Sequence, residues 1–142
     1  MIGLIAGGAV LLLTLVALAV VAAILLSDRT DADKYDGAER SVVDTIDEFE
    51  QALEDEEVRL VCDELFTDRW EAQVSAGAAE GSCEDLLLDE IENSRQQQID
   101  VNEVRVRGRR ATAEVEEGGT DETIVLVREG VSWRIDLIDV HE

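Results

Sequence analysis

The stretch VRVRGRRATAEVEEGGTDETIVLVREGVSWRIDLI, residues 104–138, decides the fold of this chain. Along it, apolar side chains alternate with polar ones in four short runs, as is typical of strands that bury one face. Glycines separate the runs at Gly108, at Gly118–Gly119 and at Gly130. Because tight glycine turns join antiparallel neighbours, we predict a meander of three to four strands.

The residues before this stretch follow a helical period instead. From Ala38 to Leu53 apolar residues recur at steps of three and four, which predicts one amphipathic helix of four or five turns. A second helix is predicted to begin with Asp55–Glu57 in its first turn, where acids suit the helix dipole, and to bury a stripe from Val58 to Phe66.

Two shorter helices complete this half of the domain. Thr67 is expected to cap a third helix that carries Trp70 and ends at Gly77. Ser82 and Asp85 form a capping pattern for a fourth, whose apolar residues lie between Leu86 and Ile91. Since helices precede strands, we predict an α+β domain over residues 38–140, with three to four helices packed on one face of a curled antiparallel sheet.

An uncharged run precedes the domain. Residues 2–26 contain no charged side chain, and about 20 apolar residues suffice for a transmembrane helix. No basic segment precedes the run and no clear cleavage site precedes Ser27, so we favour a retained single-pass anchor over a cleaved signal peptide. Residues 27–37 are predicted to form a polar linker. Gly3 and Gly7 have a spacing that permits helix pairing in the membrane and is also common by chance in a Gly- and Ala-rich span.

The charges that flank the span do not decide its orientation. We expect the domain to lie outside the cytoplasm, at the cell membrane, because a long segment follows the span and because the domain holds two cysteines, Cys62 and Cys83. Two cysteines in a small outward-facing domain usually pair, which predicts a disulfide. Two free buried thiols are the alternative.

Composition excludes several functions. The chain has 34 acidic and 12 basic residues and a formal net charge of −22, so nucleic acid is an unfavourable partner. Its single histidine, His141, is close to the C-terminus, where we expect a frayed tail. We therefore predict no catalytic residues, no metal site and no cofactor. The strand carboxylates Glu114 and Asp136 are expected to face solvent, and the arginines around Arg105 are expected to balance surface charge.

The closing pattern, in which a turn leads to Trp133-Arg134-Ile135 on the last strand, resembles the membrane-anchored or secreted members of the nuclear transport factor 2-like (NTF2-like, SnoaL-like) superfamily. The resemblance covers about residues 38–139 and implies a cone-shaped α+β domain. Isomerases of that superfamily use a tyrosine and carboxylic acids inside the cone. Here the only tyrosine, Tyr35, precedes the first predicted helix, which departs from the enzyme pattern.

Three functions remain open on this basis. The domain is a tethered module that binds a small apolar ligand or another envelope protein, an isomerase or hydrolase of the same superfamily, or a structural subunit of a larger membrane assembly. We favour the first. The residues predicted to line a cavity between helices and sheet are apolar or aromatic, and filling the core is their alternative role: Phe49, Trp70, Leu88, Val115 and Trp133.

Overall fold

The computed structural model describes residues 35–77, 81–93 and 98–141. The predicted span at 2–26, the Gly3 and Gly7 pairing motif and most of the predicted linker lie outside these residues. From Tyr35 onward, none of the described helices combines the length and the apolar character that crossing a membrane requires.

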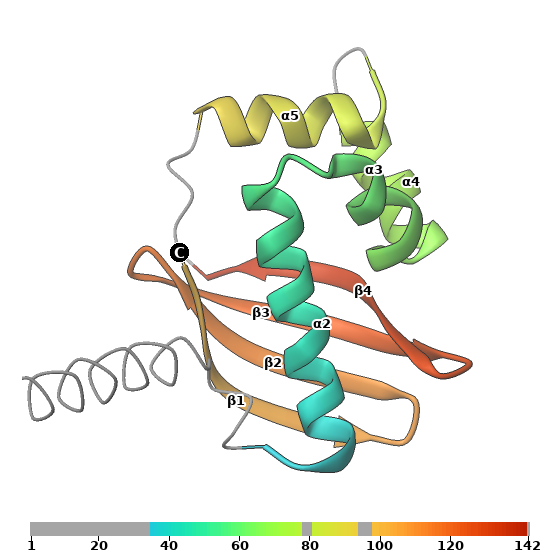
Figure 1. Cartoon of the computed structure of the whole chain (residues 1–142), viewed down its shortest axis with the longest axis vertical. Helices are drawn as coiled ribbons and strands as arrows, with labels where there is room; N and C mark the ends of the chain where they lie inside the picture. The colour runs from blue at the N-terminus through green and yellow to red at the C-terminus, as the bar shows by residue number, and fades with distance from the viewer. Residues whose placement is uncertain (1–34, 78–80, 94–97, 142) are drawn as a thin grey trace, which may run out of the picture. The chain divides into compact units, whose positions relative to one another are not determined.

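The strands form one antiparallel sheet in chain order, as the alternation predicted (Figure 1). Each strand is joined to the next by a short turn, and the fold is α+β. The sheet consists of β1 (Ile99–Arg107), β2 (Arg110–Glu117), β3 (Thr120–Glu129) and β4 (Ser132–Val140).

The first described helix, α2 (Gly37–Glu54), lies across one face of this sheet (Figure 1). Its bounds agree within one residue with the predicted ones. Its apolar stripe is buried, with Val42, Val43 and Ile46 fully inaccessible to solvent. Opposite it, β2 contributes Ala111 and Ala113, which are also buried. Small side chains on the sheet leave room for a helix to approach closely, so this half of the domain has a solid interior.

The second helix differs from its prediction. Glu56 adopts a left-handed conformation with a φ of 57°, and the helix α3 begins only at Val58, so Asp55–Glu57 connect two helices and form no first turn. After α3 (Val58–Leu60) the chain widens into a π-helical segment, Val61–Leu65, in which the Phe66 N–H donates to the Val61 carbonyl at 2.9 Å. Such single π turns are rare and usually mark a local constraint.

The two remaining helices begin where the capping patterns predicted. The hydroxyl of Thr67 accepts the Trp70 N–H at 3.1 Å at the start of α4 (Asp68–Gly77). At the start of α5 (Cys83–Asn93), the Ser82 N–H donates to the Asp85 carboxylate, and the Asp85 N–H donates to the Ser82 hydroxyl. Figure 1 shows α3, α4 and α5 gathered at the C-terminal end of α2, with α4 beside β4.

A bulge in β4 overturns the expectation that Asp136 faces solvent. Leu126 pairs with Ile135 and Val125 with Leu137, so Asp136 is an extra residue between them. Because a bulge breaks the strict alternation of faces, both Ile135 and Asp136 are buried, the latter with 7% of its surface exposed.

The buried Asp136 joins the sheet to α4. Its carboxylate accepts hydrogen bonds from Thr67 Oγ1 at 2.8 Å and from Arg69 Nη2 at 2.6 Å. The Thr67 N–H donates to the Ile135 carbonyl at 2.9 Å, which extends the edge of β4 by one backbone bond. The hydrogen bonds from Arg69 are the largest influence on Asp136 and hold its pKa below the usual range, although burial opposes them.

The predicted disulfide between Cys62 and Cys83 is present. It joins the π-helical segment to the first residue of α5, and both cysteines are buried. Cys83 is the only buried residue of α5, so the bridge is the main connection of this helix to the core.

Replacing both cysteines, Cys62→Ala/Cys83→Ala, should lower the free energy of unfolding by about 3 kcal/mol, because the bridge closes a loop of 21 residues in the unfolded chain. For a domain of this size the loss corresponds to a fall of roughly 10 °C or more in Tm. Thermal unfolding of the full chain in detergent micelles, followed through tryptophan fluorescence, measures it. A change of less than about 2 °C would mean that the bridge contributes little.

Candidate functional site

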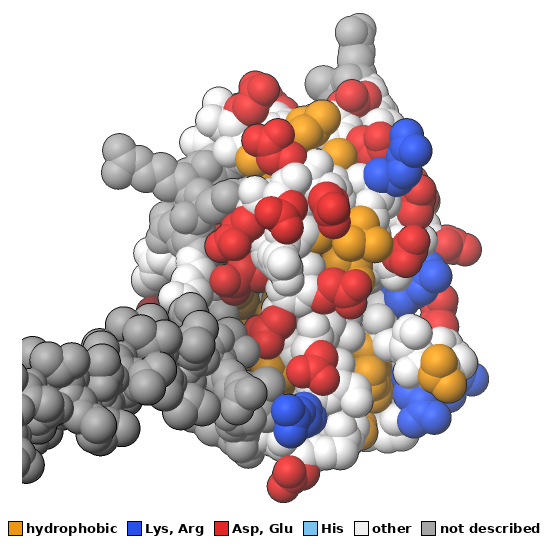
Figure 2. Space-filling model, in the orientation of Figure 1, with side chains coloured by type: hydrophobic (Ala, Val, Ile, Leu, Met, Phe, Trp, Pro, Cys, Tyr) orange, Lys and Arg blue, Asp and Glu red, His pale blue; other side chains and the backbone are white. Residues whose placement is uncertain are grey.

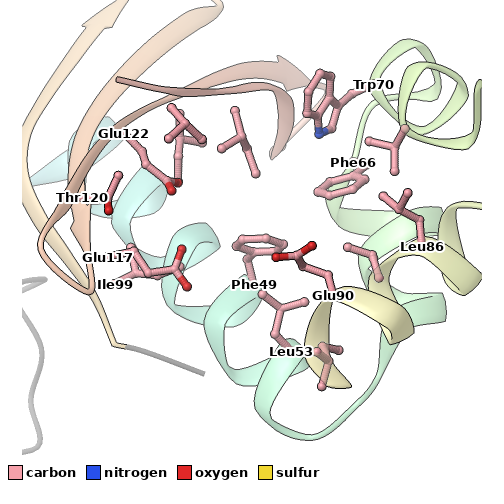
Figure 3. Close-up of a pocket in the computed structure, with 16 residues that line it drawn as sticks. Phe49, Leu53, Phe66, Trp70, Leu86, Glu90, Ile99, Glu117, Thr120 and Glu122 are labelled. Atoms are coloured by element: carbon pink, nitrogen blue, oxygen red, sulfur yellow. The ribbon is translucent and has the colours of Figure 1, made fainter. Parts of the chain in front are cut away.

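The described domain contains a cavity of about 410 Å³ between the sheet and the helices α2, α4 and α5 (Figure 3). Pockets for small molecules usually have volumes of roughly 300 to 1,000 Å³, so this one can hold a small ligand. It is located beyond the solid part of the core, where α5 replaces α2 as the cover of the sheet.

Most of the wall is apolar. From α2 come Phe49 and Leu53, and α4 contributes Trp70. Phe66 lies between them: its ring centroid is 5.9 Å from that of Phe49 and 6.3 Å from that of Trp70. The three rings form a continuous aromatic wall that favours contact with an apolar ligand. The remaining apolar groups come from α4, α5 and the sheet: Val74, Leu86, Leu87, Ile91, Ile99, Ile124, Ile138 and Val140.

Three carboxylates interrupt this apolar lining. Glu117 ends β2, Glu122 belongs to β3, and Glu90 comes from α5. In Figure 3 the side chains of Glu117 and Glu122 point into the cavity from the sheet, and that of Glu90 points into it from the helix. Among the described residues, none that lines the cavity is a lysine or arginine.

Burial and mutual repulsion act on these acids. The pKa of Glu117 is raised, first by burial and then by the negative charges of Glu122, Glu50 and Glu90. Burial alone raises the pKa of Glu122. The pKa of Glu50, on α2, is also raised by burial, although its carboxylate accepts the Ile99 N–H at 2.9 Å. Burial thus disfavours the charged forms of Glu117 and Glu122 within the cavity wall.

The indole nitrogen of Trp70 is a further polar group of the site. Within the described parts of the chain it is the one buried side-chain nitrogen or oxygen without a hydrogen-bond partner. Figure 3 shows it on the side of the ring toward Phe66. Unpaired buried donors are uncommon in proteins, and a ligand with an acceptor atom is one way to satisfy such a group.

The structure brings only two of the five predicted lining residues to the cavity. Phe49 and Trp70 do line the cavity, whereas the other three candidates do not. Leu88 points away from it and is 39% exposed, because its neighbours Leu86 and Leu87 occupy the inner side of α5. Val115 and Trp133 belong to the solid core, where α2 and the chain around Phe66 cover the sheet.

Glu117 and Glu122 were missed at the sequence level, although the alternation contains a signal for them. Ala111, Ala113 and Val115 share one face of β2, and Glu117 is the next residue on that face. Glu122 precedes Ile124 by two residues on the same face of β3, and it pairs with Val115. A carboxylate in register with buried apolar residues is informative even in a very acidic chain.

Other groups that could take part in chemistry are occupied or exposed. Glu114 lies on the solvent side of β2, 3.7 Å from Arg105, which also pairs with Glu103. Asp136 is a weak base, because its pKa is lowered and its oxygens already accept bonds from Thr67 and Arg69. No set of three or more His, Cys, Asp or Glu residues in the described ranges is arranged to hold a metal ion.

The two residues at the ends of the described chain are held in place. The Tyr35 hydroxyl donates to the carbonyl of Asn102, the extra residue of a bulge in β1, at 3.3 Å. The tyrosine is therefore outside the set that lines the cavity. The expected frayed state of His141 is wrong: its N–H donates to the Asp121 carbonyl at 3.0 Å, and its Nε2 lies 2.7 Å from Thr123 Oγ1.

The surface is acidic as well. Figure 2 shows Asp and Glu side chains spread over the visible face, with hydrophobic side chains between them and few basic ones. No family model, no curated protein and no solved structure matches this chain. Membership of the NTF2-like superfamily therefore stays a prediction.

The substitution Glu117→Gln should stabilise the domain at neutral pH. The pKa of Glu117 is higher in the folded state than in the unfolded state, where it is about 4.3. The domain therefore loses stability as the pH rises through these two pKa values and the carboxylate becomes charged. The side chain is only partly buried, so solvent screening limits the gain to less than about 1 kcal/mol, or roughly 2 to 5 °C in Tm at pH 7. The gain should be much smaller at about pH 4, where Glu117 is mostly protonated in both states.

The matched control is Glu116→Gln, which removes the same charge from an exposed neighbour on the opposite face of β2. Thermal unfolding of the full chain in micelles at pH 4 and pH 7 compares the two variants. Equal gains in Tm from the two variants would mean that the stabilisation comes from the lower net charge and not from the cavity.

Proposed function

We propose that this protein is a membrane-tethered binding module whose domain lies outside the cytoplasm and takes a small apolar ligand into the cavity between α5 and the sheet. The observation that carries the proposal is the cavity itself, with its volume of about 410 Å³ and its aromatic wall of Phe49, Phe66 and Trp70. Domains of this size need most of their apolar residues to form a core, so apolar side chains that line a cavity favour a binding role.

Binding is favoured over catalysis by the types of residue present. Within the described ranges, the cavity lining contains no histidine, cysteine, serine or lysine, which are common nucleophiles and proton carriers. The isomerase or hydrolase alternative would depend on Glu117 or Glu122, because Glu114 and Asp136 lie elsewhere and are engaged by arginines.

Two features support a place on the outer side of the membrane. The run at residues 2–26 is uncharged and long enough to span a bilayer. The disulfide between Cys62 and Cys83 is of a kind that persists in oxidising compartments and is rare in the cytosol. The helices over one face of an antiparallel sheet, with a cavity between them, are also the arrangement that an NTF2-like domain would have, and we propose that membership as well.

The topology leads to a protease experiment. In intact cells or spheroplasts that express the full chain, added protease should digest the domain, because residues 28–142 face outward in the proposal. Immunoblotting against a C-terminal tag measures the loss. Protection until lysis would contradict the orientation, and a mature N-terminus near Ser27 would contradict the anchor.

The cavity leads to a binding experiment on the full chain in phospholipid nanodiscs. The two indole N–H signals in ¹⁵N NMR report separately on Trp70, in the cavity wall, and Trp133, in the core. Addition of 1-decanol, a neutral apolar probe, should shift the Trp70 signal and leave that of Trp133 unchanged. The variant Trp70→Phe assigns the signals.

A matched pair on α5 locates the probe. Leu87→Gln, in the cavity wall, should raise the midpoint of the titration about tenfold, the effect of losing roughly 1.4 kcal/mol of apolar contact. Leu88→Gln, next to it and exposed, should leave the midpoint unchanged. Absence of any shift at Trp70, or equal effects of the two variants, would contradict binding in this cavity.

A further inference from the structure

We infer that the ligand of this cavity carries a positive charge: the geometry points to an alkylammonium amphiphile whose headgroup lies beside Glu117 and Glu122. Its chain would extend past Phe49 toward Phe66 and Trp70. The inference rests on the proposed function, because it names the chemical class of the ligand that the cavity takes.

The first step is the origin of the three carboxylates. They come from three separate elements, α5, β2 and β3, and they point into one cavity (Figure 3). Glu117 and Glu122 also occupy positions on the inner face of the sheet that continue the buried rows of Val115 and Ile124. An exposed acidic helix face would have neither property. The carboxylates therefore belong to the cavity and are distinct from the general acidity of the surface.

The second step is the lack of a partner for two of these charges. Asp136 and Glu50 are also sheltered from solvent, and both are matched by donors: Asp136 by Arg69 and Thr67, and Glu50 by the Ile99 N–H. Glu117 and Glu122 make no hydrogen bond or ion pair within the described residues. Partly burying a carboxylate without a partner costs free energy, and a bound cation would offset that cost.

The third step is the polarity of the cavity along its length. Figure 3 shows Glu117 and Glu122 at the end formed by the turn between β2 and β3, and Phe66 and Trp70 at the opposite end, with Phe49 between. One end therefore suits a positive headgroup and the other an apolar chain. A carboxylate ligand such as a fatty acid would meet repulsion at the acidic end, and a neutral alkane or alcohol would leave both carboxylates desolvated and unpaired.

The test compares three probes with the same ten-carbon chain: decyltrimethylammonium, 1-decanol and decanoate, each below its critical micelle concentration. The full chain is held in nanodiscs of zwitterionic phosphatidylcholine, and the Trp70 indole signal gives the titration midpoint. Each midpoint is expressed relative to the wild-type chain for the same probe. The ratio cancels partition of the probe into lipid.

Two double variants separate the cavity from the net charge. Glu117→Gln/Glu122→Gln removes two charges from the inner face. Glu116→Gln/Asp121→Asn removes two charges from the residues that precede them in the chain, which pair with each other across the strands and are exposed. For the inner variant, the decyltrimethylammonium midpoint should rise at least about tenfold, the 1-decanol midpoint should stay within about threefold, and the decanoate midpoint should fall. For Glu116→Gln/Asp121→Asn, all three midpoints should stay within about threefold of the wild type.

The outcomes distinguish this inference from the proposed function. If 1-decanol shifts Trp70 but the inner variant does not weaken decyltrimethylammonium, the cationic ligand is excluded and apolar binding stands. If both double variants weaken it equally, the attraction arises from net charge and the inference is overturned. If none of the three probes shifts Trp70, the inference and the proposed function both fall.

Discussion

The arrangement of helices over the sheet depends on one buried carboxylate. Asp136 lies in the β4 bulge and accepts hydrogen bonds from Thr67 and Arg69, at the two sides of the α4 N-terminus. The Thr67 N–H also donates to the Ile135 carbonyl. The chain between the π-helical segment and α4 is therefore fixed against one point of the sheet edge. This attachment positions the neighbouring Phe66 and Trp70 in the cavity wall. Without the bulge, Asp136 would fall on the solvent side and α4 would lack this polar attachment.

Two parts of the interior differ in how they are filled. Under α2 the sheet presents small residues such as Ala111 and Ala113, and the helix fills the space with Val42, Val43 and Ile46. Beyond the end of α2 the cavity lies between the sheet and α5, and Leu86 and Leu87 of that helix reach inward without being fully buried. A solid core and a cavity therefore share one sheet, and the solid part supplies stability that the cavity part lacks.

Local patterns predicted most of the fold, because its elements depend on nearby residues. The alternation and glycines of residues 104–138 predicted the strands, and Thr67, Ser82 and Asp85 predicted two helix starts. The cavity was only partly predictable. Whether Val115 faces α2 or a cavity depends on where α2 ends, about 60 residues earlier in the chain. The sequence around Val115 does not indicate that position. Asp136 was misjudged because a bulge shifts the register, and Glu117 and Glu122 were hidden among 34 acids.

The attachment of α5 has a kinetic consequence. The helix is bound covalently at its first residue, Cys83, and has no other buried residue along its length. Local opening of such an element costs much less free energy than global unfolding, since few apolar contacts are lost. A small swing of α5 about Cys83 would expose the cavity while α2 and the sheet stay intact. A ligand in the proposed site would then exchange without global unfolding, with the disulfide as the pivot of α5.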